Sequence, residues 1–173
     1  MQDIDAAAKA YQDFLTALGI DASAGINVAD SARNTAILMA EMMRGLHEEK
    51  PALSVMPALS NDLVSLKNLP FYSFCGHHFV PFFGTIQIDY YPDKSIAGLG
   101  SFSRVIEFFA RRPQFQENLC AQIADYIFES DLHPKAVRIQ LLSRQMCMEL
   151  HGAGDHTMFE SIAIRGEQVL FKK

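Results

Sequence analysis

Four consecutive residues, Cys75-Gly76-His77-His78, have the types and the spacing of a metal-binding turn. A cysteine and a histidine three positions apart can direct a thiolate and an imidazole at one metal ion. Gly76 can supply the backbone conformation that such a tight turn needs. Cys147 is the candidate for a third ligand, because Cys120 lies among the apolar positions of an expected helix. Three protein ligands leave a fourth tetrahedral position for water, which is the arrangement of a catalytic zinc ion.

A purely structural interpretation of the same residues is also open. Scattered cysteines are often buried apolar residues, and paired histidines can lie in a surface loop. The count of three cysteines, without a signal peptide, argues against a disulfide framework. Spacing alone therefore does not decide between a metal site and packing.

The apolar pattern around these residues predicts helices and strands in separate blocks. Helical spacing favours helices over residues 3–18, 28–47, 101–112 and 114–132. Alternating or extended patterns favour strands over residues 63–66, 83–91, 95–99, 137–147 and 159–164. Hairpin strands with helices on one side are typical of an α+β fold with an antiparallel sheet. A strand continuing through residue 147 would direct Gln145 and Cys147 to the same face.

Length, composition and charge limit the function further. The chain has 173 residues, of which 49% are hydrophobic, enough for a real core. A net charge of -5 argues against a nucleic-acid partner, although a local basic pocket could still bind an anionic small molecule. No apolar run reaches the roughly 18–20 residues that span a bilayer, so no membrane partner is expected. The acidic start lacks the basic region of a signal peptide, and we expect a cytoplasmic protein.

Several short motifs between residues 75 and 152 occur in a fixed order and spacing. They are Cys75-Gly76-His77-His78-Phe79-Val80, Gly84, Tyr91-Pro92, Gly98-Leu99, the run from Arg104 to Gln114, Gln116-Glu117, Cys147 and Gly152. Ordered similarity over about 80 residues is far more specific than one short motif. This stretch resembles the core of the GTP cyclohydrolase I family, as a divergent member. The match around Arg33 and Glu41 is looser, and the C-terminal end matches poorly.

The resemblance implies roles for individual residues. The zinc ligands of the family match Cys75, His78 and Cys147. The histidine that donates and accepts protons beside the metal matches His77. The residues that hold the guanine edge, whose adjacent N–H groups suit a carboxylate, match Gln116 and Glu117. The cations that face the triphosphate match Arg104 and Arg33. Further substrate-binding positions fall on Leu99, Gly100, Ser101 and His151.

The resemblance also implies a reaction and an assembly. In the family, zinc-bound water attacks C8 of a guanine nucleotide, formate is released, and GTP becomes dihydroneopterin triphosphate on the way to folate and biopterin. The implied fold is the tunnelling fold, in which homo-oligomeric rings form, usually a decamer of two pentamers with active sites between subunits. Residues 1–50 would then form an N-terminal helical region and residues 51–173 one catalytic unit.

The chain departs from the family at several site positions. Gln145 stands where the family has a second catalytic histidine, and glutamine can hydrogen-bond but cannot shuttle a proton. Other departures are Gly76 for glutamate, Gly100 for serine, Ser101 and Ala36 for lysines, and His151 for arginine. Each charge-assisted hydrogen bond is worth about 1.5–3 kcal/mol. The absence of the family's lysine and arginine side chains at these positions therefore predicts weaker binding of a triphosphate. Arg138 or Arg144 could compensate.

Three hypotheses follow from the residues and the resemblance. The first is a zinc-dependent hydrolase that opens a purine imidazole ring, either in the standard family reaction or as a divergent form. The divergent form would act on a less phosphorylated purine or pterin, or stop at the ring-opened formamide. The second is a zinc-containing binding or regulatory paralogue without turnover. A nitrile-reducing relative would need a reactive cysteine outside a metal site and a nicotinamide-binding segment, and neither is found.

Overall fold

The computed structural model describes residues 2–21, 23, 25–152 and 157–171. The chain divides into two compact units, Met1–Arg44 and Gly45–Lys173. The division falls inside a short 3-10 helix, η2 (Arg44–Leu46), near the boundary expected at residue 50. Within the part of the chain that is described, no helix combines the length and the apolar character needed to cross a membrane.

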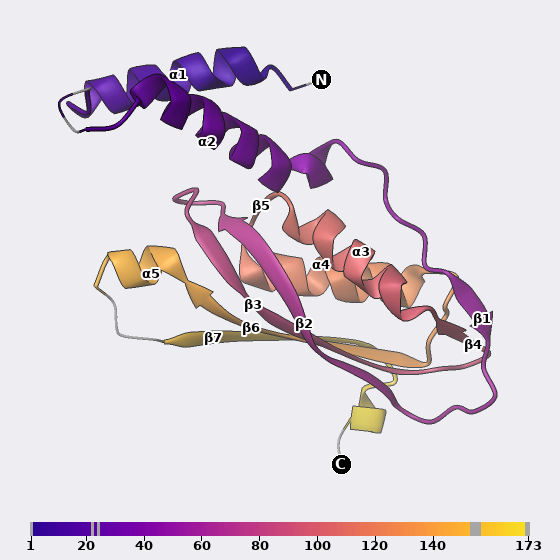
Figure 1. Cartoon of the computed structure of the whole chain (residues 1–173). Helices are drawn as coiled ribbons and strands as arrows, with labels where there is room; N and C mark the ends of the chain where they lie inside the picture. The colour runs from indigo at the N-terminus through magenta and orange to yellow at the C-terminus, as the bar shows by residue number, and fades with distance from the viewer. Residues whose placement is uncertain (1, 22, 24, 153–156, 172–173) are drawn as a thin grey trace. The chain divides into compact units, whose positions relative to one another are not determined.

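The first unit is a pair of helices, α1 (Ile4–Ala17) and α2 (Val28–Met42), that pack against each other (Figure 1). Each helix begins after a capping residue, Asp3 or Asn27, whose side chain accepts a hydrogen bond from a backbone amide of the first turn. Such caps satisfy amides that have no partner within the helix.

The second unit is built on a five-stranded sheet with the strand order β5-β2-β3-β6-β7. These strands are β2 (Val64–Cys75), β3 (Pro81–Tyr91), β5 (Pro113–Gln114), β6 (Ala136–Gln145) and β7 (Met158–Gly166). Neighbouring strands run antiparallel, except that β5 pairs in parallel with β2. A separate antiparallel pair is formed by β1 (Val55–Pro57) and β4 (Ser95–Ala97). The architecture confirms the predicted α+β class.

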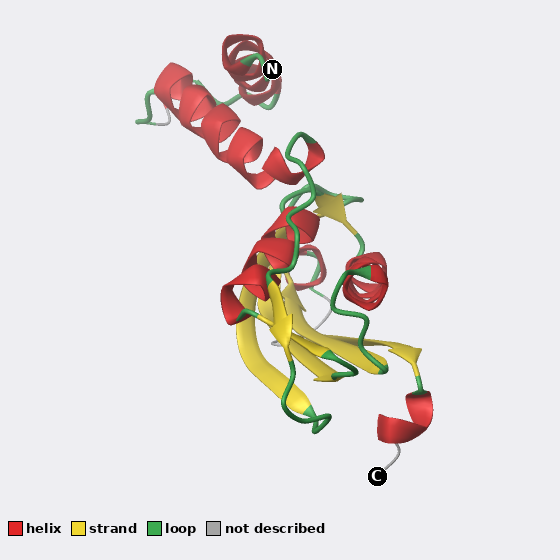
Figure 2. Cartoon of the chain, turned by 90° about the vertical axis from the view of Figure 1, so that its right-hand side faces the viewer, coloured by secondary structure: helices red, strands yellow, loops and turns green. Residues whose placement is uncertain are grey.

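Two helices, α3 (Leu99–Ala110) and α4 (Gln116–Glu129), pack on one face of this sheet (Figures 1 and 2). Strand alternation directs one set of side chains at the helices. Ile86, Ile139 and Leu141 belong to that set and are fully buried. At helical spacing, α3 and α4 contribute the buried residues Val105, Ile106, Leu119, Cys120, Ile123 and Ile127. The core of the unit therefore lies between this inner face and the helices, and Cys120 is part of it, as predicted.

The opposite, outer face of the sheet holds a buried carboxylate. Asp89 of β3 is 1% exposed and accepts hydrogen bonds from the side chains of Ser65, Gln87 and Arg138. The C-terminal 3-10 helix, η3 (Gln168–Phe171), lies over this network, with the Phe171 ring centroid 5.1 Å from the Arg138 guanidinium carbon. Arg138 is thus engaged within the sheet, and its side chain is 30% exposed.

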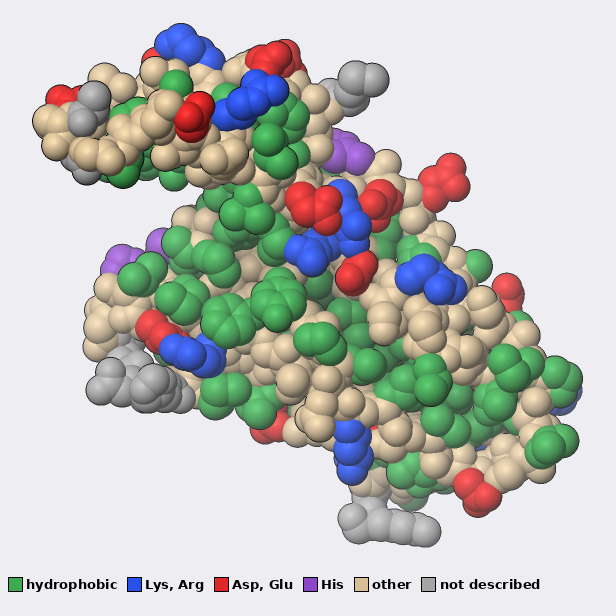
Figure 3. All heavy atoms as spheres, viewed as in Figure 1, with side chains coloured by type: hydrophobic (Ala, Val, Ile, Leu, Met, Phe, Trp, Pro, Cys, Tyr) green, Lys and Arg blue, Asp and Glu red, His purple; other side chains and the backbone are tan. Residues whose placement is uncertain are grey.

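The outer face also carries exposed apolar side chains. Tyr72, Leu142, Met158 and Ile162 are each between 38% and 54% exposed. Figure 3 shows hydrophobic side chains gathered over β2 and β3 on the face presented by Figure 1. The described chain thus leaves an apolar surface uncovered on the side of the sheet that lacks α3 and α4.

The largest difference from the predicted elements lies at the end of β6. The strand ends at Gln145, and the chain continues as a short helix, α5 (Met146–Leu150). The prediction of a strand running through Cys147 is therefore wrong. The sequence of α5, Met146-Cys147-Met148-Glu149-Leu150, contains mostly unbranched side chains with good helix propensity and no β-branched residue.

Candidate metal centre and active-site pocket

Three ligand groups from distant parts of the second unit converge at one point. Cys75 ends β2, His78 lies in the turn that follows, and Cys147 lies in α5. One potential ligand atom from each residue lies within 4.8 Å of the other two. The structure therefore brings together the three residues that the sequence predicted as ligands, although they are distant along the chain.

The turn after β2 is fixed by backbone hydrogen bonds. The amide of Cys75 donates to the Val80 carbonyl at 2.9 Å, and the amide of Phe79 donates to the Cys75 carbonyl at 2.9 Å. Phe79 has a positive φ of 53°, whereas Gly76 is not among the positive-φ residues. The prediction that Gly76 supplies the special conformation is wrong, because Phe79 supplies it. The Gly76 amide instead donates to the Gln114 carbonyl at 3.0 Å, which joins the turn to β5.

Cys147 is placed by the junction between β6 and α5. A bidentate ion pair fixes this junction, since Arg144 of β6 donates to the two carboxylate oxygens of Glu149 at 2.8 and 2.6 Å. Burial raises the pKa of the Cys147 thiol, and the adjacent Cys75 raises it further. A divalent cation bound here would offset this rise by stabilising the Cys147 thiolate.

The donor atoms fit a tetrahedral metal ion. The Sγ of Cys75 and the Nδ1 of His78 are 3.9 Å apart. With Zn–S near 2.3 Å and Zn–N near 2.1 Å, tetrahedral geometry separates such donors by roughly 3.6–3.8 Å. The chemistry of the set, two sulfur atoms and one imidazole nitrogen, also matches a zinc-type site with one position left for another ligand.

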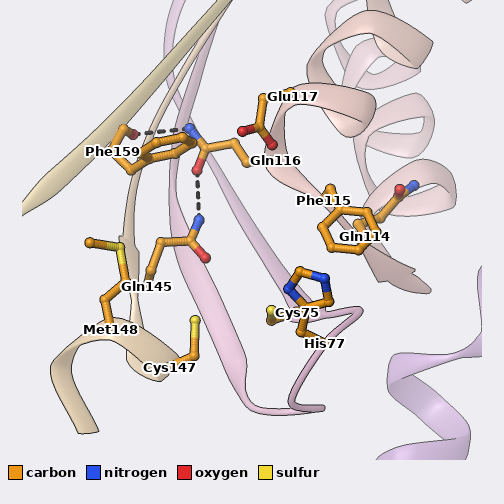
Figure 4. Close-up of a pocket in the computed structure, with 10 residues that line it drawn as sticks. All are labelled: Cys75, His77, Gln114, Phe115, Gln116, Glu117, Gln145, Cys147, Met148 and Phe159. Carbon is orange, nitrogen blue, oxygen red and sulfur yellow. Dashed lines mark hydrogen bonds between the residues drawn. The ribbon is translucent and has the colours of Figure 1, made fainter. Parts of the chain in front are cut away.

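A cavity of about 240 Å³ opens beside two of these ligands (Figure 4). Its lining residues are Cys75, His77, Gln114, Phe115, Gln116, Glu117, Gln145, Cys147, Met148 and Phe159. They come from the end of β2, the start of α4, the junction of β6 with α5, and β7. The cavity is smaller than the roughly 300–1,000 Å³ of typical ligand pockets, and its size suits a heterocycle better than a whole nucleotide.

His77 and Glu117 present ionisable groups to this cavity. His77 follows Gly76 in the turn, and its ring packs edge-on against Phe115 with centroids 4.8 Å apart. The His77 ring is also 5.9 Å from the ring of the ligand His78. Glu117 lies in the first turn of α4 and is exposed. A histidine beside a metal centre and a carboxylate across the cavity are the groups that proton transfer and recognition of N–H donors require.

Gln116 and Gln145 form an internal hydrogen-bond network on the wall of the cavity (Figure 4). The Nε2 of Gln116 donates to the Phe159 carbonyl at 2.9 Å and to the Leu141 carbonyl at 3.4 Å. The Oε1 of Gln116 accepts from the Ser143 hydroxyl and from the Nε2 of Gln145, the latter at 2.9 Å. Gln116 is 3% exposed, so its side chain is engaged by the protein itself.

The remaining predicted substrate-binding residues do not line this cavity. Leu99, Gly100, Ser101 and Arg104 lie at the start of α3. Ser101 is 2% exposed, and its hydroxyl accepts a hydrogen bond from the Ser54 amide at 3.1 Å. Leu99 and Arg104 are exposed.

Two further predicted residues lie elsewhere. His151 follows α5, and its exposed ring lies 5.2 Å from the His78 ring. Arg33 belongs to the first unit, where it pairs with Asp5 at 2.6 Å.

Sequence reasoning missed several residues of the cavity wall. Phe115 and Phe159 contribute aromatic or apolar surface, and Ser143 links the two glutamines. Ser143 lies two positions from both Leu141 and Gln145 along β6, so strand alternation places the three side chains on one face. This pattern could have predicted that Ser143 points inward. Nothing in the sequence indicates that Phe159, which lies beyond α5 on β7, reaches the same wall.

The chain is similar in sequence to known proteins over most of its length. The family model of GTP cyclohydrolase I matches residues 7–168. GTP cyclohydrolase 1 of Lysinibacillus sphaericus (strain C3-41) is 38% identical over 147 residues, which cover 83% of this chain and 77% of that protein. GTP cyclohydrolase 1 of Geobacillus sp. (strain WCH70) is 40% identical over 129 residues, covering 72% of this chain and 68% of that protein.

A shorter match is found in Aquifex aeolicus (strain VF5), whose GTP cyclohydrolase 1 is 45% identical over 92 residues, or 53% of this chain and half of that protein. These matches define the chain as a hydrolase of the class that acts on carbon–nitrogen bonds of cyclic amidines. Within that class, the chain belongs to the GTP cyclohydrolase I family.

Proposed function

We propose that this protein is a zinc-dependent hydrolase that opens the imidazole ring of a guanine nucleotide. The observation that carries the proposal is the convergence of Cys75, His78 and Cys147 beside a cavity that also contains His77 and Glu117. The family match supports the same class of reaction. The donor set of two thiolates and one imidazole supports zinc as the metal.

Each part of the cavity has a role in this reaction. Cys75, His78 and Cys147 would hold the zinc ion, which when bound would supply water activated for attack on the ring carbon between two nitrogens. His77, within the same turn, holds or releases a proton at a ring nitrogen as the carbon–nitrogen bond breaks. Glu117 accepts hydrogen bonds from the adjacent N–H groups of the guanine edge. Phe115, packed edge-on against His77, limits the motion of the His77 ring.

The cavity accounts for the base but not for the phosphate end of a nucleotide. Arg104 lies at the exposed start of α3 and does not line the cavity, and Ser101 stands where a lysine was expected and is buried. We propose that a second copy of the chain completes the site in a ring assembly of the tunnelling fold. The exposed apolar side chains on the outer face of the sheet support such an assembly.

We further propose that the substrate carries fewer phosphates than GTP, or that the reaction stops at the ring-opened formamide. Gln145 stands where a second proton-transferring histidine was expected, and its amide is bonded to Gln116 and Ser143. A side-chain amide does not change its protonation state near neutral pH, so it cannot act as a general acid or base. Within the cavity wall, His77 is therefore the imidazole available for proton transfer.

The test is an assay of purified, zinc-loaded protein with GTP, GMP and guanosine, in which ultraviolet absorbance and released formate are followed together. Ring opening without formate, or turnover only of GMP or guanosine, supports the divergent enzyme. Formate and a fluorescent pterin from GTP would show the standard reaction. Absence of turnover together with nucleotide binding would indicate a binding paralogue. A His77→Ala variant, which should retain zinc and lose ring opening, is the control for the chemical step.

A further inference from the structure

The directions of the surrounding hydrogen bonds fix the orientation of the side-chain amides of the two glutamines in the cavity wall. A backbone carbonyl can only accept, so the side-chain atom of Gln116 that faces the carbonyls of Leu141 and Phe159 must be the donating Nε2. This fixes the carbonyl oxygen of Gln116 on the other side. That oxygen can only accept, so Gln145 must turn its own Nε2 toward it, at 2.9 Å.

Ser143 reinforces this order. Its fully buried hydroxyl donates to the Oε1 of Gln116 and accepts from the Nε2 of Gln145 at 3.1 Å. If Gln145 were flipped, its carbonyl oxygen would face the oxygen of Gln116, and the single Ser143 hydroxyl proton could satisfy only one of these two acceptors. The Oε1 of Gln145 therefore points away from the network and into the cavity (Figure 4). No hydrogen bond to it comes from the part of the chain that is described.

We propose that Gln116 is a positioning residue that locks Gln145, and that Gln145 presents a fixed hydrogen-bond acceptor to the ligand beside the metal centre. A ligand that fits must place an N–H or O–H group against this oxygen. An imidazole at position 145 could donate or accept by changing its tautomer, whereas the locked amide can only accept on the cavity side. The choice of ligand rests on the proposed function, but the lock itself does not.

The lock is tested without any ligand by following side-chain amide signals of ¹⁵N-labelled protein in NMR spectra. In Gln116→Met, the amide signal of Gln145 should shift and lose part of its protection from hydrogen exchange, because the closer of its two acceptors is gone and only Ser143 remains. Gln140→Met changes a glutamine of the same strand whose side chain bonds to Glu160 on the outer face, and it should leave the Gln145 signal in place. An unchanged Gln145 signal in Gln116→Met would overturn the lock. Gln116→Ala removes the same acceptor with a smaller side chain and serves the same purpose if Gln116→Met does not fold.

Transmission to the ligand is tested by a double-mutant cycle. GMP binding to zinc-loaded protein is measured by calorimetry in a His77→Ala background, which prevents turnover. Gln145→Leu and Gln116→Met should each weaken binding about 3- to 10-fold, the effect of one hydrogen bond. The double variant should bind no more weakly than Gln145→Leu alone, because Gln116 acts only through Gln145.

If the double variant weakened GMP binding by the product of the two single effects, Gln116 would contact the ligand directly. The positioning role would then be wrong. A failure of GMP to bind the His77→Ala protein would count against the proposed substrate, and the NMR comparison would still decide the lock.

Discussion

Replacing Arg138 by methionine should destabilise the second unit, because it removes the cation beside the buried carboxylate of Asp89. The Asp89 side chain is 2% exposed and the Arg138 side chain 30% exposed, with Nη2 and Oδ2 2.5 Å apart. Removing one partner of a fully buried ion pair costs about 3–5 kcal/mol. Since Arg138 is partly exposed and Ser65 and Gln87 still donate to Asp89, we expect about 2–3 kcal/mol.

The assay is urea unfolding at pH 7 and at one fixed protein concentration, because assembly would make the stability depend on concentration. With a urea dependence of about 2 kcal/mol per molar, the midpoint should fall by roughly 1 M. Lys135→Met is the matched control, since Lys135 pairs with Asp93 at 3.9 Å and both side chains are at least 36% exposed. Such a surface pair contributes about 0–1 kcal/mol.

Acidification gives an independent check on the same pair. Burial raises the pKa of Asp89, but hydrogen bonds from Ser65, Gln87 and Arg138, with the Arg138 charge, outweigh burial and hold the pKa below its usual range. A carboxyl whose pKa is lower in the folded state stabilises the protein above its unfolded pKa, near 4, and loses this contribution as the pH falls through the folded pKa. In Arg138→Met the folded pKa rises, so the loss should begin at higher pH. Equal midpoints for Arg138→Met and Lys135→Met would refute this reasoning.

Four further outcomes are expected. Cys147→Ser should lose bound zinc in elemental analysis after gel filtration, whereas Cys120→Ser should retain it; equal zinc contents would remove Cys147 from the site. Burial raises the pKa of Cys120 to about 12, so its thiol should react with a disulfide reagent at pH 8 only after unfolding, and rapid labelling of native protein would contradict its burial. Glu117→Gln should weaken GMP binding about 10- to 100-fold without loss of zinc, and unchanged affinity would exclude the guanine-edge role. Gly84→Ala should lower the melting temperature, because a Cβ there would lie 2.0 Å from the Leu142 carbonyl oxygen, and an unchanged melting temperature would be inconsistent with that contact.

The sequence predicted the ligand residues and the fold class because both depend on patterns within short segments. The spacing of Cys75 and His78 predicted two metal ligands, and the exclusion of Cys120 as a core residue left Cys147 as the third. In the structure Cys120 is buried, and one potential ligand atom from each of the three residues lies within 4.8 Å of the other two. Helical spacing and strand alternation predicted the α+β class because both depend on periodicity within one segment.

The rest depends on contacts between distant segments. Strand alternation predicted that Cys147 continues β6, but the chain turns into α5 and a helix presents the thiol. The engagement of Gln116 by the carbonyls of Leu141 and Phe159 could not be predicted, because no local pattern specifies which backbone groups α4 meets. Whether Gln145 donates or accepts toward the cavity follows only from that arrangement.

A metal ion bound by Cys75, His78 and Cys147 would have a mechanical role as well as a chemical one. Cys75 and Cys147 are 72 positions apart (147 − 75 = 72), and the intervening segment contains β3, α3, α4 and β6. A metal ion bound by both would close this segment into a loop, as a cross-link does, and its binding energy would add to the stability of the fold. The pairing of β6 with β3 and of β3 with β2 brings these ligands together. Metal binding would therefore stabilise this pairing, and a chelator would lower the stability of the fold as well as stop the chemistry.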